Sequence, residues 1–355
     1  MHSVQLGPLV LANPLVVAPM TTYSSHPNGD IADDELTYLA RRTGYGAIMT
    51  AACCVHPSGY SFEGQWQCWD DRHVPSLRRA AEAIHSTGAK AILQIHHGGR
   101  MAPSRLCGEP VSASAIPAPR EGAETPRALT LAEIDELIQA YADAARRGVE
   151  AGYDGIEIHG ANTYLLQQFV SPHSNRRDDE YGQDPYLMSE RVARAVRAVV
   201  PSPVAVGYRF SPEEIEEPGL DLDRTAGLLG RLEECGLDFL HISLRSYEQE
   251  SARQPERGAI LPLVVSMVTL PLIGVGSVLT REDVEHCLAL GCRAVAVGRG
   301  ALTDPDFAHK VARGETPIAV LPAGDFAAEC VLPAGLAAKI EAVPGWIPRA
   351  EAVAP

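Results

Sequence analysis

Three polar side chains stand close together directly after an apolar run of the sequence. His159 and Asn162 are three positions apart, and Tyr164 follows two positions later. A histidine and an asparagine can both donate hydrogen bonds to one oxygen atom and so polarise a carbonyl group, and a nearby phenol can deliver a proton. This spacing indicates proton-transfer chemistry on a carbonyl compound, although a packed or solvated histidine is the ordinary alternative at such a position.

A second group of polar residues ends three other apolar runs. These residues are Thr21, Gln94 and Arg209. An amide suits the edge of a ring that both donates and accepts hydrogen bonds, and a guanidinium suits an accumulating negative charge. Together the three fit a flavin, whose reduced form is anionic at its pyrimidine end. Taken singly, they would be a turn residue, a polar residue at the mouth of a barrel and a member of a surface salt bridge.

Glycines follow the last two apolar runs, in Gly276-Ser277 and in Gly298-Arg299. A glycine lets backbone N–H groups approach an anion closely, and an arginine adds a bidentate contact. We therefore expect a phosphate site here, with simple tight turns as the alternative.

Several histidines also lie near the ends of apolar runs. None belongs to an H-x-x-x-H pair or to a helical motif of histidine and carboxylate, so we expect no metal site. The residues concerned are His56, His96, His97, His159 and His241.

The elements that must position these residues alternate along the chain. Eight runs rich in Val, Ile, Leu and Ala show no alternation with polar residues, as is typical of strands buried on both faces. Segments with helical periodicity follow them, which predicts a parallel α/β fold and, from the number of strands, a single-domain (β/α)8 TIM barrel. A doubly wound open sheet is the alternative, but no G-x-G-x-x-G follows the first strand. The predicted strands are 15–18, 47–52, 89–95, 155–159, 203–210, 239–243, 270–276 and 293–298.

Seven helices are predicted between and after these strands. The segment 252–268 is ambiguous, because Pro255 and Pro262 interrupt its pattern. In a barrel the active site lies at the carboxyl ends of the strands, where all the polar residues above would meet. The predicted helices are 33–43, 74–87, 131–151, 185–199, 222–235, 281–290 and 305–312.

Composition excludes some classes of function. Lys and Arg total 30 and Asp and Glu total 45, a net charge of −15 over 355 residues, which disfavours nucleic-acid binding. No run of about 18 apolar residues predicts a membrane span, and the first 20 residues lack a basic region typical of a signal peptide. We therefore expect a cytoplasmic protein whose eight cysteines are free thiols.

Over residues 3–315 the sequence resembles the old yellow enzyme family of flavin-dependent ene-reductases. The signature that follows the fourth strand is the most specific match. In chain order the matching motifs are Ala18-Pro19-Met20-Thr21, Gln94-x-x-His97-x-Gly99-Arg100, His159-Gly160-Ala161-Asn162-x-Tyr164-Leu165-x-x-Gln168-Phe169-x-Ser171-Pro172, Asn175-x-Arg177-x-Asp179-x-Tyr181-Gly182 and Gly298-Arg299-x-x-Leu302-x-Asp304-Pro305.

The resemblance implies a barrel that holds FMN non-covalently and takes electrons from NAD(P)H. It implies that His159 and Asn162 bind the oxygen of an enone or nitroalkene, with Tyr23 also at the substrate, and that Tyr164 is the proton donor. No residue marks a preference for NADH or NADPH. The cofactor-binding residues that it implies are Pro19, Met20, Thr21, Ala52, Gln94, Arg209, Gly276, Ser277, Gly298 and Arg299.

The sequence departs from the family in places that concern the substrate pocket. Tyr60 stands where many relatives carry arginine, and the segments 183–191 and 208–210 diverge. We expect residues 1–315 to form the barrel and 316–355 to wrap it or to contact a neighbouring subunit in a homo-oligomer, through Trp346 or Arg349. Cys330 is the only cysteine after position 292, so no iron–sulfur cluster is expected.

Two other functions are compatible with a barrel. A flavin-free aldolase or isomerase acting on a phosphorylated substrate would need a lysine or a carboxylate base at a strand end. None of the three lysines, Lys90, Lys310 and Lys339, ends a predicted strand. A barrel that stores flavin or regulates is the third hypothesis, and it predicts bound FMN that NAD(P)H does not reduce.

Overall fold

The computed structural model describes residues 1–351 and contains a closed barrel of eight parallel strands. The last strand pairs with the first and the second pairs with the third, which closes the ring. The predicted TIM barrel is thus confirmed, and the open sheet is wrong. The strands of the barrel are β3 (Leu15–Val17), β4 (Ala47–Met49), β6 (Lys90–His96), β9 (Gly155–Gly160), β10 (Ala205–Phe210), β11 (Phe239–Ile242), β12 (Leu272–Val275) and β13 (Ala294–Val297).

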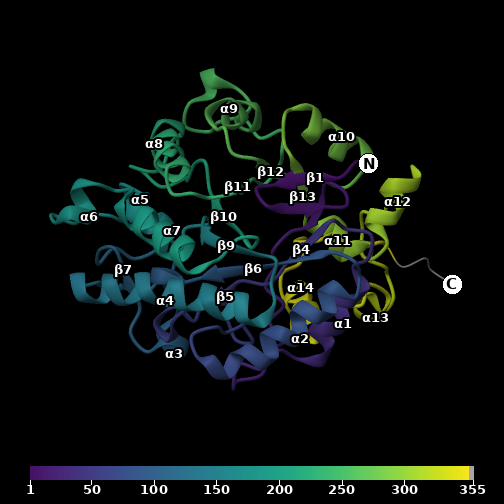
Figure 1. Ribbon diagram of the computed structural model, residues 1–355, viewed down its shortest axis with the longest axis horizontal. Helices are drawn as coiled ribbons and strands as arrows, with labels where there is room; N and C mark the ends of the chain where they lie inside the picture. The colour runs from purple at the N-terminus through teal and green to yellow at the C-terminus, as the bar shows by residue number, and fades with distance from the viewer. Residues whose placement is uncertain (352–355) are drawn as a thin grey trace.

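The main helices lie outside the strands (Figure 1). The longest, α4, begins with a reciprocal cap between Thr130 and Glu133 and ends at Gly152, whose φ of +94° suits glycine. These helices are α1 (Asp33–Arg41), α2 (Val74–His85), α4 (Leu131–Ala151), α7 (Leu187–Val199), α8 (Leu222–Glu233), α9 (Ile260–Met267), α10 (Arg281–Ala289) and α12 (Phe307–Arg313).

The ambiguous segment 252–268 contains a short 3₁₀ turn, η4 (Pro255–Arg257), followed by α9. Pro262 is the third residue of α9. A proline is tolerated there because the first N–H groups of a helix have no partner within the helix. The helix therefore forms despite both prolines.

A hairpin that the sequence did not predict closes the amino-terminal end of the barrel. It consists of β1 (Val4–Leu6) and β2 (Leu9–Leu11), which pair antiparallel. Leu6, Leu9 and Leu11 are buried in one apolar cluster with inward-facing residues of the strands, such as Ala47 and Phe239. The floor of the barrel is thus apolar and lies at the end opposite to the predicted active site.

The residues after 316 pack beside α1, where Figure 1 draws α13 (Phe326–Glu329) and α14 (Ala334–Glu341). The buried Arg42, which directly follows α1, donates hydrogen bonds to the carbonyl groups of Cys330 at 2.8 Å and Val331 at 3.0 Å. The backbone N–H of Gly335 donates to Ser24 Oγ at 2.8 Å. The start of α14 therefore contacts the loop that follows β3, close to the predicted flavin motif.

Short elements fill the connections between the barrel strands and helices. They are β5 (Cys53–Cys54), β7 (Val111–Ser112), β8 (Arg127–Ala128), α3 (Ser104–Cys107), α5 (Leu165–Val170), α6 (Glu180–Gln183), α11 (Arg299–Thr303), η1 (Pro57–Gly59), η2 (Asp71–His73) and η3 (Gly99–Met101). All eight cysteines are free, as predicted. Between residues 1 and 351 no helix has both the length and the apolar character that crossing a bilayer requires.

Candidate active site

Two cavities adjoin at the carboxyl end of the barrel and share Pro19 and Arg209 in their walls. The larger has a volume of about 580 Å³ and the smaller about 330 Å³. Every predicted cofactor residue lines one of them, although these residues come from the ends of six different strands. The larger cavity contains Met20, Gly276, Ser277, Gly298 and Arg299, and the smaller contains Thr21, Ala52, Gln94, His159, Asn162 and Tyr164.

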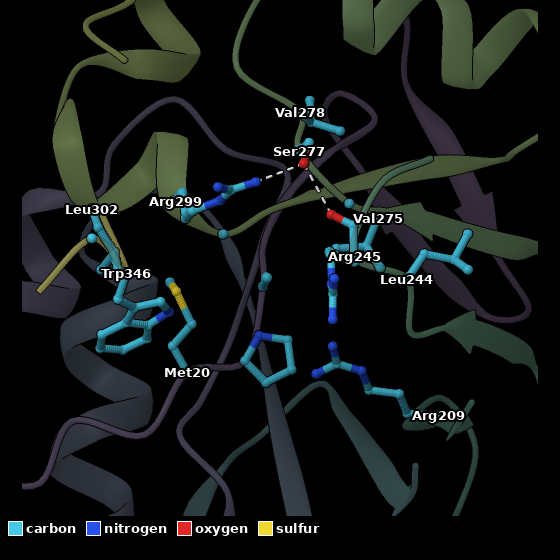
Figure 2. Close-up of a pocket in the computed structure, with 15 residues that line it drawn as sticks. Met20, Arg209, Leu244, Arg245, Val275, Ser277, Val278, Arg299, Leu302 and Trp346 are labelled. Carbon is cyan, nitrogen blue, oxygen red and sulfur yellow. Dashed lines mark hydrogen bonds between the residues drawn. The ribbon is translucent and has the colours of Figure 1, made fainter. Parts of the chain in front are cut away.

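The larger cavity is positively charged. Arg209, Arg245 and Arg299 line it, and within residues 1–351 none of the three has a carboxylate partner in a salt bridge. Arg299 donates a hydrogen bond to Ser277 Oγ at 2.6 Å, as Figure 2 shows. Three guanidinium groups without carboxylate partners in a chain of net charge −15 fit an anionic ligand such as a phosphate.

The backbone around Ser277 packs closely against the loop that follows β11. Gly276 has φ of +121° and Ser277 has φ of +52°. A Cβ atom on Gly276 would come within 2.7 Å of the Ser246 backbone, so only glycine fits there. The hydroxyl of Ser277 donates to the carbonyl of Arg245 at 2.9 Å, which fixes the loop after β12 against the loop after β11.

The wall between the two cavities carries the amide and the guanidinium that suit a flavin. Gln94 is 1% exposed, and Arg209 Nε is buried with no hydrogen-bond partner in the described residues. An unpaired buried donor is costly unless a ligand satisfies it. The pair therefore fits the pyrimidine portion of FMN, with the phosphate at Arg299 and Ser277 in the larger cavity.

His159 lies in the smaller cavity as a neutral ring with a defined tautomer. Its Nδ1 atom accepts a hydrogen bond from the backbone N–H of Ala161 at 3.2 Å, so the proton of the neutral ring is on Nε2. Burial, assisted by the charges of His96 and Arg209, lowers the pKa of His159 well below its usual value. His159 is therefore a hydrogen-bond donor that carries no charge.

Tyr164 packs edge-on against two imidazole rings. Its ring centroid is 4.3 Å from that of His96 and 5.2 Å from that of His159. Burial raises the pKa of the Tyr164 phenol, which keeps it protonated at neutral pH. A protonated phenol at the cavity wall can donate a proton to a bound molecule.

Asn162 occupies the left-handed region with φ of +58°, a conformation that asparagine tolerates better than most residues. Its backbone N–H donates to Ser211 Oγ at 2.8 Å, and its amide Nδ2 donates to Ser243 Oγ at 3.1 Å. Arg209 donates to the same Ser243 oxygen at 3.2 Å. Ser243 therefore connects the predicted oxygen-binding asparagine to the predicted flavin-binding arginine.

Some residues of the site were not predicted. Phe62 lines the smaller cavity, while Tyr23 does not, and its ring lies edge-on to Phe62 at 5.6 Å. Tyr23 therefore lies behind Phe62 at this wall, and its contact with substrate stays a prediction. Arg245, Ser243 and Phe62 have no pattern in the sequence that sets them apart from ordinary loop residues.

The two residues suggested to reach a neighbouring subunit are engaged within their own chain. Trp346 lines the larger cavity, on the side of Met20 and Leu302 (Figure 2). Arg349 donates to the carbonyl groups of Pro322, Ala323 and Gly324 at 3.1, 3.0 and 2.7 Å. Arg349 is thus held by its own chain in this structure, and contact of either residue with a neighbouring subunit stays a prediction.

The comparisons with known proteins agree with this geometry. A family described as "NADH:flavin oxidoreductase / NADH oxidase family" matches residues 2–316. "NADH:acrylate oxidoreductase" of Vibrio harveyi is 40% identical over 324 residues, which cover 86% of this chain and 32% of that protein. "Probable NADH-dependent flavin oxidoreductase YqiG" of Bacillus subtilis is 38% identical over 353 residues, covering 96% of this chain and 95% of that protein. The chain thus spans about a third of the acrylate oxidoreductase.

The fold agrees with a solved structure as well. The old yellow enzyme homologue from Zymomonas mobilis has a TM-score of 0.80 and 25% identity, covering 90% of this chain and 94% of that one. A family of NADH:flavin oxidoreductases favours a flavin-dependent oxidoreductase over the flavin-free aldolase or isomerase that a barrel also allows. The chain belongs to the NADH:flavin oxidoreductase family that includes the old yellow enzymes.

Proposed function

We propose that this protein is an ene-reductase, which uses NAD(P)H to reduce the activated C=C bond of enones or nitroalkenes. In this proposal FMN lies across both cavities. Its phosphate is held by Gly276, Ser277, Gly298 and Arg299, and its pyrimidine end by Gln94 and Arg209. Pro19, Met20, Thr21 and Ala52 line the flavin between these ends.

When bound and reduced, FMN supplies a hydride from N5 to the β-carbon of the alkene. His159 Nε2–H and the Asn162 amide donate hydrogen bonds to the substrate oxygen, so that the alkene is polarised and the developing enolate or nitronate is stabilised. Each such donor contributes roughly 3–4 kcal/mol of transition-state stabilisation in comparable oxyanion sites. Since His159 is neutral, it can stabilise this charge without surrendering a proton.

Tyr164 then transfers its proton to the α-carbon. Its raised pKa suits a donor that must stay protonated until a strongly basic carbon is presented. With both transfers made, the alkene gains a hydride and a proton. The Tyr164 phenolate takes up a proton from water to complete the cycle.

One observation carries the proposal. A neutral imidazole donor, an amide and a protonated phenol line a cavity of about 330 Å³ that adjoins the cationic cavity suited to the FMN phosphate. The name of the Vibrio harveyi relative contains acrylate, an activated alkene. Because this chain spans only a third of that protein, the substrate class proposed here rests on the site and not on that name.

The test uses the purified protein with bound FMN under anaerobic conditions. We expect NADH or NADPH to bleach the flavin absorption, and 2-cyclohexenone to restore it with one equivalent of cyclohexanone formed. Reduction with nicotinamide deuterated at the transferred position should place deuterium at the β-carbon.

Two results would contradict the proposal in different ways. A flavin that NAD(P)H cannot reduce would favour a storing or regulatory barrel. A flavin that is reduced but not reoxidised by either 2-cyclohexenone or a nitroalkene would indicate that the protein passes electrons to another acceptor.

A further inference from the structure

A buried polar network lies inside the barrel, beside the residues assigned to the flavin. Gln94 is 1% exposed, and Glu157 and His241 are fully buried. Gln94 Nε2 donates a hydrogen bond to Glu157 Oε1 at 2.7 Å, and His241 Nδ1 lies 2.7 Å from Glu157 Oε2. Three polar side chains from β6, β9 and β11 thus meet in an otherwise apolar interior.

The network spans β10, the strand that lies between β9 and β11. Gly207 of β10 lies in register with Glu157, and the neighbouring inward position, Arg209, lies in register with His241. A Cβ atom on Gly207 would come within 2.1 Å of the Phe239 ring. Glycine at 207 therefore makes room for the Phe239 ring, and Glu157 and His241 meet across β10 at 2.7 Å.

Glu157 determines which way the Gln94 amide points. An ionised carboxylate only accepts hydrogen bonds, so the amide nitrogen of Gln94 must face Glu157. The Gln94 oxygen is then left for the cavity, where it can only accept. A flavin presents one N–H donor at its pyrimidine ring, N3–H, and this donor is complementary to the exposed amide oxygen.

Glu157 also supplies the negative charge in this part of the interior. Burial raises the pKa of Glu157, but its pairing with His241, the charge of Arg209 and the hydrogen bond from Gln94 lower it by more, so Glu157 is ionised at neutral pH. Arg209 forms no salt bridge of its own within residues 1–351, and the Glu157 carboxylate is the acidic group that stabilises its charge. The Glu157 carboxylate therefore partly balances the positive charge that Arg209 presents to a ligand.

We infer that Glu157 is a positioning residue for the flavin, one that fixes the Gln94 amide with its oxygen toward N3–H and lowers the midpoint potential of bound FMN by opposing the charge of Arg209. This inference rests on the proposed placement of the pyrimidine end at Gln94 and Arg209. Glu157 lines neither cavity, so it acts through its neighbours and not by contact with substrate.

The substitution Glu157→Gln separates this role from simple support of the fold. Its oxygen can still accept from His241, and its new NH₂ group then faces Gln94. Gln94 must rotate to present its oxygen to this NH₂, which leaves its own NH₂ facing flavin N3–H. Two donors would oppose each other, and we expect FMN affinity to fall about 10- to 100-fold.

The same substitution should weaken FMN binding but make the bound FMN easier to reduce, because the carboxylate charge is lost. Reduced FMN is anionic at its pyrimidine end, so removing a nearby negative charge favours the reduced form. We expect the oxidised-to-reduced equilibrium of bound FMN to shift by about tenfold or more, which is roughly 30 mV upward for a two-electron couple. A role confined to packing would leave this potential unchanged.

The experiment compares three variants of the full chain with the unmodified protein. FMN affinity is measured by quenching of flavin fluorescence, and the midpoint potential by anaerobic titration against a reference dye at saturating FMN. Asp154→Asn is the matched control, because Asp154 is a carboxylate just before β9 that binds Lys90 and His85 at the opposite end of the barrel. We expect it to lower thermal stability and to leave the potential unchanged.

Gln94→Ala distinguishes failure of the inference from failure of the proposed site. If Gln94→Ala weakens FMN binding and Glu157→Gln changes neither the affinity nor the potential, the role of Glu157 is wrong and the placement of the flavin stands. If Gln94→Ala has no effect on FMN affinity, the placement itself is wrong. A shift in potential that Asp154→Asn reproduces would also overturn the inference.

If Glu157→Gln does not fold, Glu157→Asp takes its place, because it keeps the charge but shortens the reach to Gln94. We expect this variant to lower FMN affinity with a smaller shift in potential. Unchanged affinity would contradict the inference.

Discussion

The backbone N–H of Ala161 donates a hydrogen bond to Nδ1 of His159 at 3.2 Å. This contact places the ring proton on Nε2, on the side of the smaller cavity, before any substrate arrives. Because the amide belongs to the turn that also carries Asn162, the turn after β9 orients one donor and provides the other. One short segment of backbone thus sets the geometry of the proposed oxygen site.

Replacing both donors should remove binding of substrate analogues and leave the flavin in place. For His159→Ala combined with Asn162→Ala, we expect affinity for p-hydroxybenzaldehyde to fall by at least 100-fold, since hydrogen bonds to charged oxygen contribute about 1.5–3 kcal/mol each. Perturbation of the flavin absorption on titration measures this affinity. Loss of FMN from the double variant would mean that the pair is wrongly assigned.

Tyr164→Phe should slow enone reduction by about 10²- to 10⁴-fold, the usual contribution of a general acid. The same substitution should affect nitroalkenes much less, because a nitronate is stable without a proton on carbon. Stopped-flow reoxidation of the reduced enzyme with 2-cyclohexenone and with nitrostyrene measures both rates. Equal losses for the two substrates would argue against a role for Tyr164 as proton donor.

Arg299→Met should weaken FMN binding roughly 10- to 100-fold, because a charge-assisted hydrogen bond to phosphate is lost. Riboflavin, which lacks the phosphate, should bind the variant and the unmodified protein equally. Arg313→Gln is the control, since Arg313 is exposed and pairs with Glu315 at 2.7 Å. An equal loss of affinity for riboflavin would place Arg299 elsewhere on the flavin.

Most of the fold could be predicted because strands buried on both faces leave continuous apolar runs. All eight runs correspond to strands of the barrel. The hairpin at residues 4–11 was missed because strands of three residues are too short to show a pattern. Helices such as α5 and α11 were missed for the same reason, since six or five residues do not complete two helical turns.

The residues that line the two cavities could be predicted where they belong to sequence motifs at strand ends, and less well elsewhere. Glu157 and His241 lie within strands whose sequences predict buried positions, and nothing local indicates that their side chains meet. Ser243 and Arg245 follow β11, the one barrel strand for which no site residue was proposed beyond a histidine. Their roles depend on contacts with residues more than 20 positions away, such as Ser277 and Asn162.

Acid should destabilise the protein through its buried histidines. Burial lowers the pKa of His96 to about 3, and it lowers the pKa values of His97 and His159 well below their usual range. The folded state therefore stays unprotonated at these rings, while the unfolded chain takes up protons below about pH 6.5. We expect the free energy of unfolding to fall as pH drops below 6.5, by up to about 1.4 kcal/mol per histidine per pH unit.

Urea denaturation at pH 7.0, 6.0 and 5.0 measures this dependence. His96→Phe should reduce the slope by one proton, because neither nitrogen of His96 has a hydrogen-bond partner in the described residues that the change would strand. A slope that is the same in the variant would show that His96 already titrates normally in the folded protein.

The pairing of β3 with β13 joins residues near 16 to residues near 296. A ribosome must therefore release most of the polypeptide before the ring can be sealed, and Pro19 and Arg299 become neighbours only at that moment. FMN binding by a nascent or refolding chain would then report that β3 and β13 have paired. The appearance of the yellow colour would therefore measure the rate of the last step of folding.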